Sequence, residues 1–121
     1  MATWAEVKKY VSSKYTIDES SDSLLRMTFG DGNGRTQIVF VGGDDTVVSI
    51  KSPFARIGDV QPGKIFDNAG IFGVTVVGDL YCLTHTMLTE TLDAIELDVP
   101  LALLTSEADQ LEKTLGLGDK F

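Results

Sequence analysis

The centre of this chain is the stretch Gly73-Val-Thr-Val-Val-Gly-Asp-Leu-Tyr-Cys-Leu-Thr-His-Thr-Met-Leu88, in which two apolar runs meet at Gly78-Asp79. A Gly-Asp pair between two such runs favours a tight turn between antiparallel strands. The stretch therefore predicts a β-hairpin. Further along, apolar residues recur at helical spacing and predict a helix whose apolar stripe must be covered. The hairpin is the nearest candidate to cover this stripe, which consists of Leu101, Leu104, Ala108, Leu111 and Leu115.

The ends of this last helix are marked by residues with known positional preferences. Asp98 is a suitable N-cap, and Pro100 fits the first turn, where its missing amide hydrogen costs nothing. We therefore expect the helix to begin at about Val99. Gly116 is expected to end it as a C-terminal cap.

A second helix is predicted at the N-terminal end of the sequence. Thr3-Trp4-Ala5-Glu6 has the form of a capping box, in which the Thr3 side chain accepts from the amide of Glu6 and the Glu6 carboxylate reaches back. The helix should run from about Thr3 to Lys14, followed by a polar loop at Asp18–Ser23. One face of it is apolar and carries Trp4, Val7, Val11 and Tyr15.

Three strands are expected between the first helix and the hairpin. Leu25, Met27 and Phe29 alternate with polar residues, which is the period of a half-buried strand. Gln37–Val41 is continuously apolar and suits a central strand, and Thr46–Ile50 continues as a third. The loops that join them are Gly30–Gly34 and Gly42–Asp45, both rich in glycine and acidic residues.

The segment between the third strand and the hairpin is less regular. Pro53 cannot donate to a strand ladder, so beyond it the strand should be an edge or have ended. Ile65–Ala69 could form a single helical turn that leads to the hairpin. In the final strand, alternation places Tyr81, Leu83, His85 and Met87 on one face and Cys82, Thr84 and Thr86 on the other.

The predicted order is helix, three antiparallel strands, short connection, two strands, helix. This is an α+β fold with one antiparallel sheet, and helices at both ends can pack on one of its faces. A length of 121 residues, of which 43% are hydrophobic and 23% charged, suits a single globular domain spanning residues 1–121.

Charge and composition exclude several classes of partner. The 18 acidic and 10 basic residues give a formal charge of −8, which repels a phosphate backbone, so no nucleic acid partner is expected. The acidity can also serve solubility or meet a basic partner surface.

A single cysteine, Cys82, allows no intrachain disulfide and makes a reducing cytoplasm the simplest compartment. No signal peptide or membrane anchor is expected, because no apolar run approaches the ~20 residues needed to span a bilayer.

No group stands out as catalytic. His85 is the single histidine, and threonines are its neighbours, whereas a histidine base needs an activating or orienting partner. Cys82 should face away from His85, which argues against a Cys-His dyad and favours a small buried thiol. We therefore predict no enzyme activity from these residues.

Metal and nucleotide motifs are also incomplete. Asp31-Gly-Asn-Gly-Arg35 is similar to the start of a calcium loop, but Arg35 stands at a ligand position and Gly42 where a late acid is required. A hairpin turn explains this segment better, as it does Asp44 and Asp45. The acids Glu107, Asp109 and Glu112 are expected on the solvent side of the last helix. No cofactor or metal is predicted.

The chain resembles the type III secretion chaperone-like fold and, within it, the YbjN-type bacterial domains. The resemblance rests on the order of elements and on three apolar segments. It implies a small, acidic, non-enzymatic protein that forms homodimers and, in the chaperone branch, holds an extended stretch of a client without ATP. The segments are Ile65-Phe-Asp-Asn68, Gly73-Val-Thr-Val-Val-Gly-Asp-Leu-Tyr-Cys-Leu83 and Leu101-Ala-Leu-Leu-Thr-Ser-Glu-Ala-Asp-Gln-Leu-Glu112.

Three functions follow as hypotheses. The first is a chaperone-like or regulatory protein-binding module that docks a peptide segment, a partner protein or a second copy on an exposed sheet face. The second is a small-molecule-sensing regulatory domain with Phe72, Tyr81 and His85 near a pocket. The third, an unrecognised enzyme, would require His85 to lie in a cleft beside a carboxylate.

Overall fold

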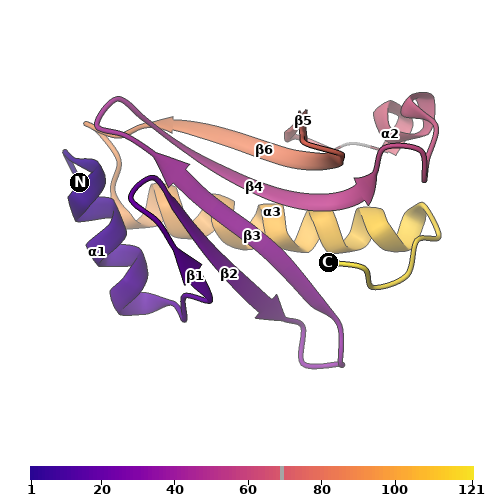
Figure 1. Ribbon diagram of the computed structural model, residues 1–121, viewed down its shortest axis with the longest axis horizontal. Coiled ribbons are helices and arrows are strands. Elements are labelled where there is room, and N and C mark those ends of the chain that lie inside the picture. The colour runs from indigo at the N-terminus through magenta and orange to yellow at the C-terminus, as the bar shows by residue number, and fades with distance from the viewer. Residues whose placement is uncertain (69) are drawn as a thin grey trace.

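The computed structural model of this protein describes residues 1–68 and 70–121. Figure 1 shows a twisted sheet with the long helix α3 lying along one side of it and α1 near one end. In chain order the elements are α1 (Trp4–Lys14), β1 (Glu19–Ser20), β2 (Leu24–Gly30), β3 (Thr36–Gly43), β4 (Val47–Arg56), α2 (Pro62–Asn68), β5 (Gly73–Val77), β6 (Leu80–Leu88) and α3 (Ala94–Thr114).

The predicted α+β class is confirmed. The described strands form one antiparallel sheet in the order β1-β2-β3-β4-β6-β5. Helices α1 and α3 both pack on one face of it, and their apolar side chains join those of the strands in one core. The core side of β2, β3, β4 and β6 is marked by fully buried aliphatic residues, namely Leu25, Met27, Val39, Val41, Val48, Ile50 and Leu83.

The predicted hairpin is present as β5 and β6. Gly78 has φ of 61°, a left-handed value that glycine adopts without strain, and the turn places Val77 opposite Leu80. Helix α3, however, does not rest on the hairpin alone. It packs against β3, β4 and β6, because the sheet order inserts β6 between β4 and β5.

The N-terminal helix matches its prediction closely. The Thr3 side chain accepts from the amide of Glu6 at 3.2 Å, while the Glu6 carboxylate reaches the amide of Ala2 at 3.4 Å. Trp4, Val7 and Val11 are buried on the sheet side of the helix. The amphipathic pattern and the cap therefore set both the position and the orientation of α1.

The predicted start of the last helix is wrong. Helix α3 begins at Ala94, and its N-cap is Asp93, whose side chain accepts from the amide of Glu96 at 2.8 Å. Pro100 therefore lies inside the helix. The buried side chains of Leu92 and Leu97 anchor this extra turn to the core and outweigh the missing proline hydrogen bond. At the other end Gly116 caps the helix as predicted, with φ of 71°.

Pro53 acts as the sequence predicted, by making β4 a local edge. The strand pairs with β6 along its whole length to Arg56, but its pairing with β3 stops at Lys51. Side chains replace the missing ladder on the β3 side. Gln37 Nε2 donates to the carbonyl of Pro53 at 2.6 Å, and Ser52 Oγ donates to the carbonyl of Ile38 at 2.6 Å. The two strands therefore stay joined without backbone ladder bonds there.

Three other details differ from the sequence predictions. The expected loop at Asp18–Ser23 contains the short edge strand β1. The expected turn at Ile65–Ala69 is part of helix α2, which begins at Pro62. Ala69, the last residue of the expected turn, lies outside the described part of the chain. Glu112 is fully buried rather than solvent-facing, because the segment after Gly116 folds back over α3 and the amide of Lys120 donates to its carboxylate at 3.0 Å.

Candidate functional site

The sheet has a second face, opposite α1 and α3, which we call the open face. One row of side chains crosses it through neighbouring strands and contains Arg26, Phe40 and Lys51. Thr84 of β6 continues the row. Within residues 1–68 and 70–121 no helix packs on this face. It therefore presents apolar and cationic side chains to solvent.

The open face is hollowed. A depression of about 390 Å³ lies over β2, β3, β4, β5 and β6, and Cys82 lies at its floor. Burial raises the pKa of the Cys82 thiol to about 11, and the positive charge of Lys51 opposes that shift. The thiol is therefore protonated at neutral pH and unreactive, which matches the prediction of a small buried thiol. The lining consists of Leu24, Phe40, Gly42, Gly43, Ser49, Lys51, Val77, Leu80 and Cys82.

Polar groups at one border of this face are paired with one another. Thr75 and Thr84 share a hydrogen bond between their hydroxyls at 2.5 Å, and Ser49 and Thr86 share one at 3.1 Å. These cross-strand pairs stabilise the sheet but offer no strong acid or base. Cys82, Thr84 and Thr86 thus share this face, as alternation predicted.

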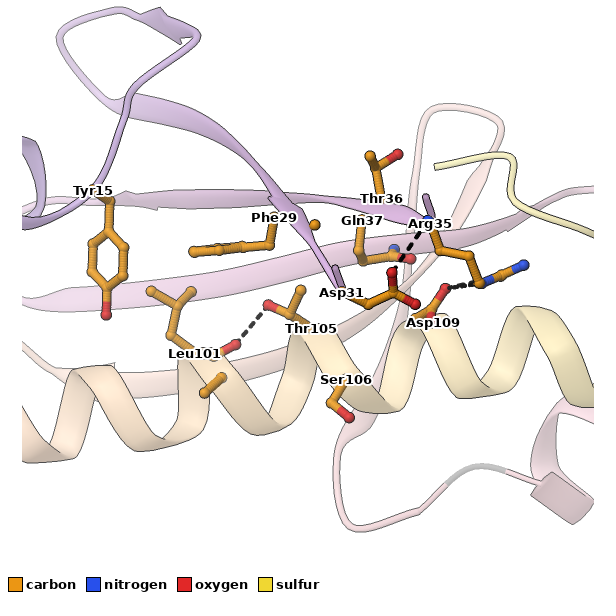
Figure 2. Close-up of a pocket in the computed structure, with 12 residues that line it drawn as sticks. Tyr15, Phe29, Asp31, Arg35, Thr36, Gln37, Leu101, Thr105, Ser106 and Asp109 are labelled. Atoms are coloured by element: carbon orange, nitrogen blue, oxygen red, sulfur yellow. Dashed lines mark hydrogen bonds and ion pairs between the residues drawn. The ribbon is translucent and has the colours of Figure 1, made fainter. Parts of the chain in front are cut away.

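A second cavity, of about 290 Å³, lies between the β2–β3 hairpin and α3. Figure 2 shows Tyr15 and Phe29 toward one end of it and Arg35 reaching Asp109 at the other. The rings of Tyr15 and Phe29 meet edge to face, with centroids 5.6 Å apart. The cavity thus joins an aromatic wall to an ion pair.

Hydrogen bonds inside the protein occupy most of the polar groups of this cavity. Arg35 Nε donates to Asp109 Oδ1 at 2.8 Å. Asp31 Oδ1 accepts from the amides of Asn33 at 2.7 Å and Arg35 at 3.2 Å, and the bond from Asn33 in particular lowers the pKa of Asp31. This arrangement is the hairpin turn that the sequence predicted. The hydrogen bond from Arg35 to Asp109 joins this turn to α3.

Gln37 is the exception among the cavity residues. It is 3% exposed, and its Nε2 donates to Ser52 Oγ at 2.8 Å and to the carbonyl of Pro53. The Pro53 carbonyl accepts only, so the amide nitrogen must face it, and the orientation of the Gln37 amide is fixed. Gln37 Oε1 consequently has no donor within the described protein.

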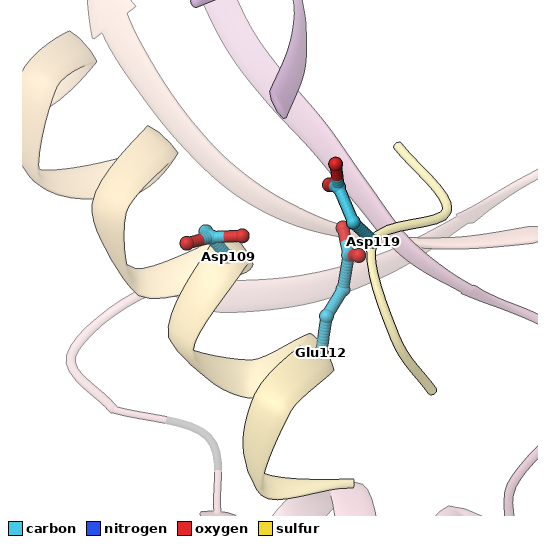
Figure 3. Close-up of side chains that lie close together, drawn as sticks. All are labelled: Asp109, Glu112 and Asp119. Carbon is cyan, nitrogen blue, oxygen red and sulfur yellow. The ribbon is translucent and has the colours of Figure 1, made fainter. Parts of the chain in front are cut away.

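An acidic cluster adjoins this cavity. Asp109 and Glu112 come from α3 and Asp119 from the segment that follows it (Figure 3), and one oxygen from each carboxylate lies within 4.8 Å of the other two. Burial raises the pKa of Glu112 to about 7. The Arg35 guanidinium lies 2.8 Å from Asp109 and 3.8 Å from Glu112. Arg35 therefore supplies a positive charge to two of the three carboxylates, and the third, Asp119, accepts from the amide of Thr36 at 3.1 Å.

The remaining candidates of the sequence do not converge. His85 lies on the core side of β6 and meets Phe72 edge to face at 6.0 Å, while Tyr81 stacks on Phe54 at 6.4 Å. Neither of the two cavities described above is lined by Phe72, Tyr81 or His85. The small-molecule hypothesis, as stated on these three residues, therefore gains no support from either cavity. The sequence analysis missed both cavities, because each is formed by residues of at least three elements that lie far apart along the chain.

No helix in the described part of the chain combines the length and the apolar character needed to cross a membrane. No family model matches this chain, and neither any curated protein nor any solved structure matches it.

Proposed function

We propose that this chain is a non-enzymatic protein-binding domain that holds an apolar segment of another protein on its open face. The hollow over Phe40, Leu80 and Cys82 carries the proposal, because an apolar depression that the described chain leaves uncovered marks a surface for a partner. The other apolar face of the same sheet is already covered by α1 and α3.

The charges of the open face specify the partner further. Arg26 and Lys51 flank Phe40 in one cross-strand row, although the whole chain carries a formal charge of −8. Arg26 lies 3.5 Å from the exposed Glu19, and no ion pair to Lys51 is formed by any described residue. A partner segment that is apolar and carries an aspartate or glutamate would satisfy the Lys51 ammonium as it covers Phe40.

The resemblance to secretion chaperones and YbjN-type domains supports the same role. A chaperone-like or regulatory protein of this kind would act as a homodimer in the bacterial cytoplasm. It would need no cofactor, nucleic acid or membrane for this function. The buried, protonated Cys82 thiol is compatible with a reducing compartment.

A library of displayed 12-residue peptides, selected against the purified protein, tests this function. Selected peptides should combine apolar residues with an acidic one, and fluorescence anisotropy should show about tenfold weaker binding to Lys51→Glu. The matched control is Lys9→Glu, which makes the same charge change on an exposed position of α1 across the sheet. Selection of basic peptides, of no peptides, or equal losses in both variants would contradict the proposal.

A small-molecule-sensing function is the second candidate, favoured by the cavity beside Gln37. The aromatic wall of the cavity would contact the apolar part of a ligand. An N–H or O–H group of the ligand would donate a hydrogen bond to Gln37 Oε1, which would require a small shift of the Gln37 side chain. A thermal-shift screen of metabolites tests it, since a ligand at 100 times its Kd adds about 2.7 kcal/mol to the folded state. Ala102→Trp, which fills the cavity from α3, should abolish any such shift. A shift that survives in Ala102→Trp, or no shift at all, would reject the candidate.

A further inference from the structure

The two edges of the sheet differ in how they are protected. Edge strand β1 has two residues, Glu19 and Ser20, both exposed and polar. Edge strand β5 has five residues, reads Gly-Val-Thr-Val-Val and carries no charge. Natural sheets protect their edges with very short strands, charges, prolines or bulges, because an unprotected edge pairs with other strands. The β1 edge uses such protection, and β5 has none of it.

The backbone of β5 has unused hydrogen-bonding groups. The two-residue turn makes Val77 and Leu80 a hydrogen-bonded pair, so Thr75 and Gly73 also bond to β6. By alternation, the amide and carbonyl groups of Val74 and Val76 point away from β6, toward the free edge. No other described segment forms a backbone hydrogen bond with them. This edge can therefore accept one more strand.

The part of the chain that contains β5 is rich in exposed apolar side chains. Ten large apolar side chains are exposed in the described chain, and five of them lie within residues 57–77. Ile71, directly before the strand, is 84% exposed, and Val76 is 54% exposed. Apolar exposure of this kind beside a free strand edge is typical of a surface that is covered in the assembled protein. The five are Ile57, Phe66, Ile71, Val76 and Val77.

We infer that β5 is the interface between two copies of this chain, paired antiparallel with the β5 of the second copy across a twofold axis at Thr75. In that register Val74 lies opposite Val76 of the second copy, and the free backbone groups of both meet as hydrogen-bonded pairs. Two molecules of charge −8 repel each other, so an uncharged strand is the place where they can meet at the least electrostatic cost.

Pairing of this kind joins the two sheets into one. The open faces of both copies then lie side by side, because strands that pair in one sheet share its faces. Val77 and Leu80 line the hollow of the open face, and Val77 lies two residues from Thr75 on the interface strand. The assembly thus places the two hollows on one continuous face. The interface itself does not depend on what the open face binds.

Light scattering after size exclusion is the first test. The wild type should have twice the 13.1 kDa mass of the chain, and Val76→Lys should be monomeric, because a lysine on an edge strand blocks pairing. Val99→Lys is the matched control: Val99 is 51% exposed on α3, and the same substitution there should leave the dimer intact. A monomeric wild type, or a dimer that Val99→Lys dissociates and Val76→Lys does not, would overturn the inference.

Crosslinking tests the register even if Val76→Lys fails to fold. Thr75→Cys is made together with Cys82→Ser, since Cys82 lies opposite Thr75 in the same hairpin. Cysteines at the twofold axis face each other at a Cα separation that suits a disulfide, so mild oxidation should give a covalent dimer. Thr86→Cys in the same background, exposed on β6, should not crosslink. A Thr75→Cys protein that stays monomeric on oxidation would reject this register. A dimer that selects no peptides would refute the proposed function alone, and a monomer that does select them would refute this inference alone.

Discussion

Asp98 of α3 accepts a hydrogen bond from Tyr15 Oη at 2.6 Å, across the junction of the two helices that share one sheet face. The same carboxylate accepts from the hydroxyl of Tyr10 and from Lys14 Nζ, the latter at 2.5 Å. One side chain near the start of α3 thus gathers three donors from the end of α1. It fixes how the helices lie relative to each other.

Asp98→Asn should destabilise the protein by about 1–2 kcal/mol at pH 7, since it removes the charge that strengthens these hydrogen bonds. Burial alone would raise the pKa of Asp98, but hydrogen bonds from Lys14, Tyr10 and Tyr15 outweigh burial and lower the pKa. The stabilisation is therefore present above the unfolded pKa of about 3.9 and is lost as the pH falls through the folded value. Urea unfolding at a series of pH values measures it.

Asp79→Asn is the control for that substitution. Asp79 pairs with Arg56 at 2.9 Å, but both side chains are more than half exposed, so the variant should change stability by less than about 0.5 kcal/mol. Equal effects of the two substitutions, or a difference for Asp98→Asn that grows below pH 4, would show that the helix junction does not depend on the Asp98 charge.

Glu112 should make the protein less stable as the pH rises. Its folded pKa of about 7 lies above the value of about 4.3 in the unfolded chain, and burial is the main cause. A raised pKa means that the favourable, protonated state is complete below about pH 4 and is lost as the pH passes 7. Glu112→Gln keeps an acceptor for the Lys120 amide and removes the titration. Its free energy of unfolding should exceed that of the wild type at pH 8 by at most about 3 kcal/mol, and match it near pH 4.

Glu107→Gln, exposed on the same helix, provides the comparison and should leave the pH profile of stability unchanged. The charged groups that act on Glu112 are Arg35, Asp109 and Asp119, and neither substitution replaces any of them. If the wild type and Glu112→Gln have parallel profiles between pH 5 and 8, Glu112 is ionised in the folded protein and the ion pair with Arg35 dominates over burial.

Two adjacent leucines of α3 differ in burial, so the same substitution at each shows how much burial contributes to stability. Leu104 is fully buried and Leu103 is 46% exposed. Leu104→Ala should lower the free energy of unfolding by about 2–5 kcal/mol, because it opens a cavity in the core, whereas Leu103→Ala should change it by no more than about 0.5 kcal/mol. Denaturant titration of the two variants measures both. A large loss at Leu103 would mean that its face of α3 is covered in the assembled protein.

Much of the fold follows from local patterns in the sequence. Alternation at Leu25, Met27 and Phe29 is enough to predict β2, and the Gly78-Asp79 pair is enough to predict the hairpin. The start of α3 was missed because Pro100 normally marks a first turn. Tertiary burial of Leu92 and Leu97 overrides that preference, and burial of this kind is not visible in a local pattern.

The candidate sites were harder to predict than the fold. The open-face hollow brings together Leu24, Phe40 and Leu80, which lie far apart in the sequence and meet through the strand order alone. The burial of Glu112 was hidden for a related reason. Glu112 lies three residues after Asp109 on α3, and the helical pattern alone places both on the solvent side. Glu112 is buried because the C-terminal segment folds over it. One signal in the sequence pointed to this fold-back, namely the apolar residue Phe121 after the Gly116 cap. In the structure Phe121 is buried.

Pro100→Ala should stabilise the protein. Pro100 lies in the interior of α3, where it has no amide hydrogen to donate to the carbonyl of Glu96 one turn earlier. Alanine restores that bond and removes the ring, so we expect a gain of about 1–3 kcal/mol in urea unfolding. Pro62→Ala is the matched control. Pro62 is the first residue of α2, where proline is favoured, and its loss should be neutral or cost up to about 1 kcal/mol. A Pro100→Ala variant less stable than wild type would show that the ring packs favourably in its half-buried position and that this packing exceeds the cost of the missing hydrogen bond.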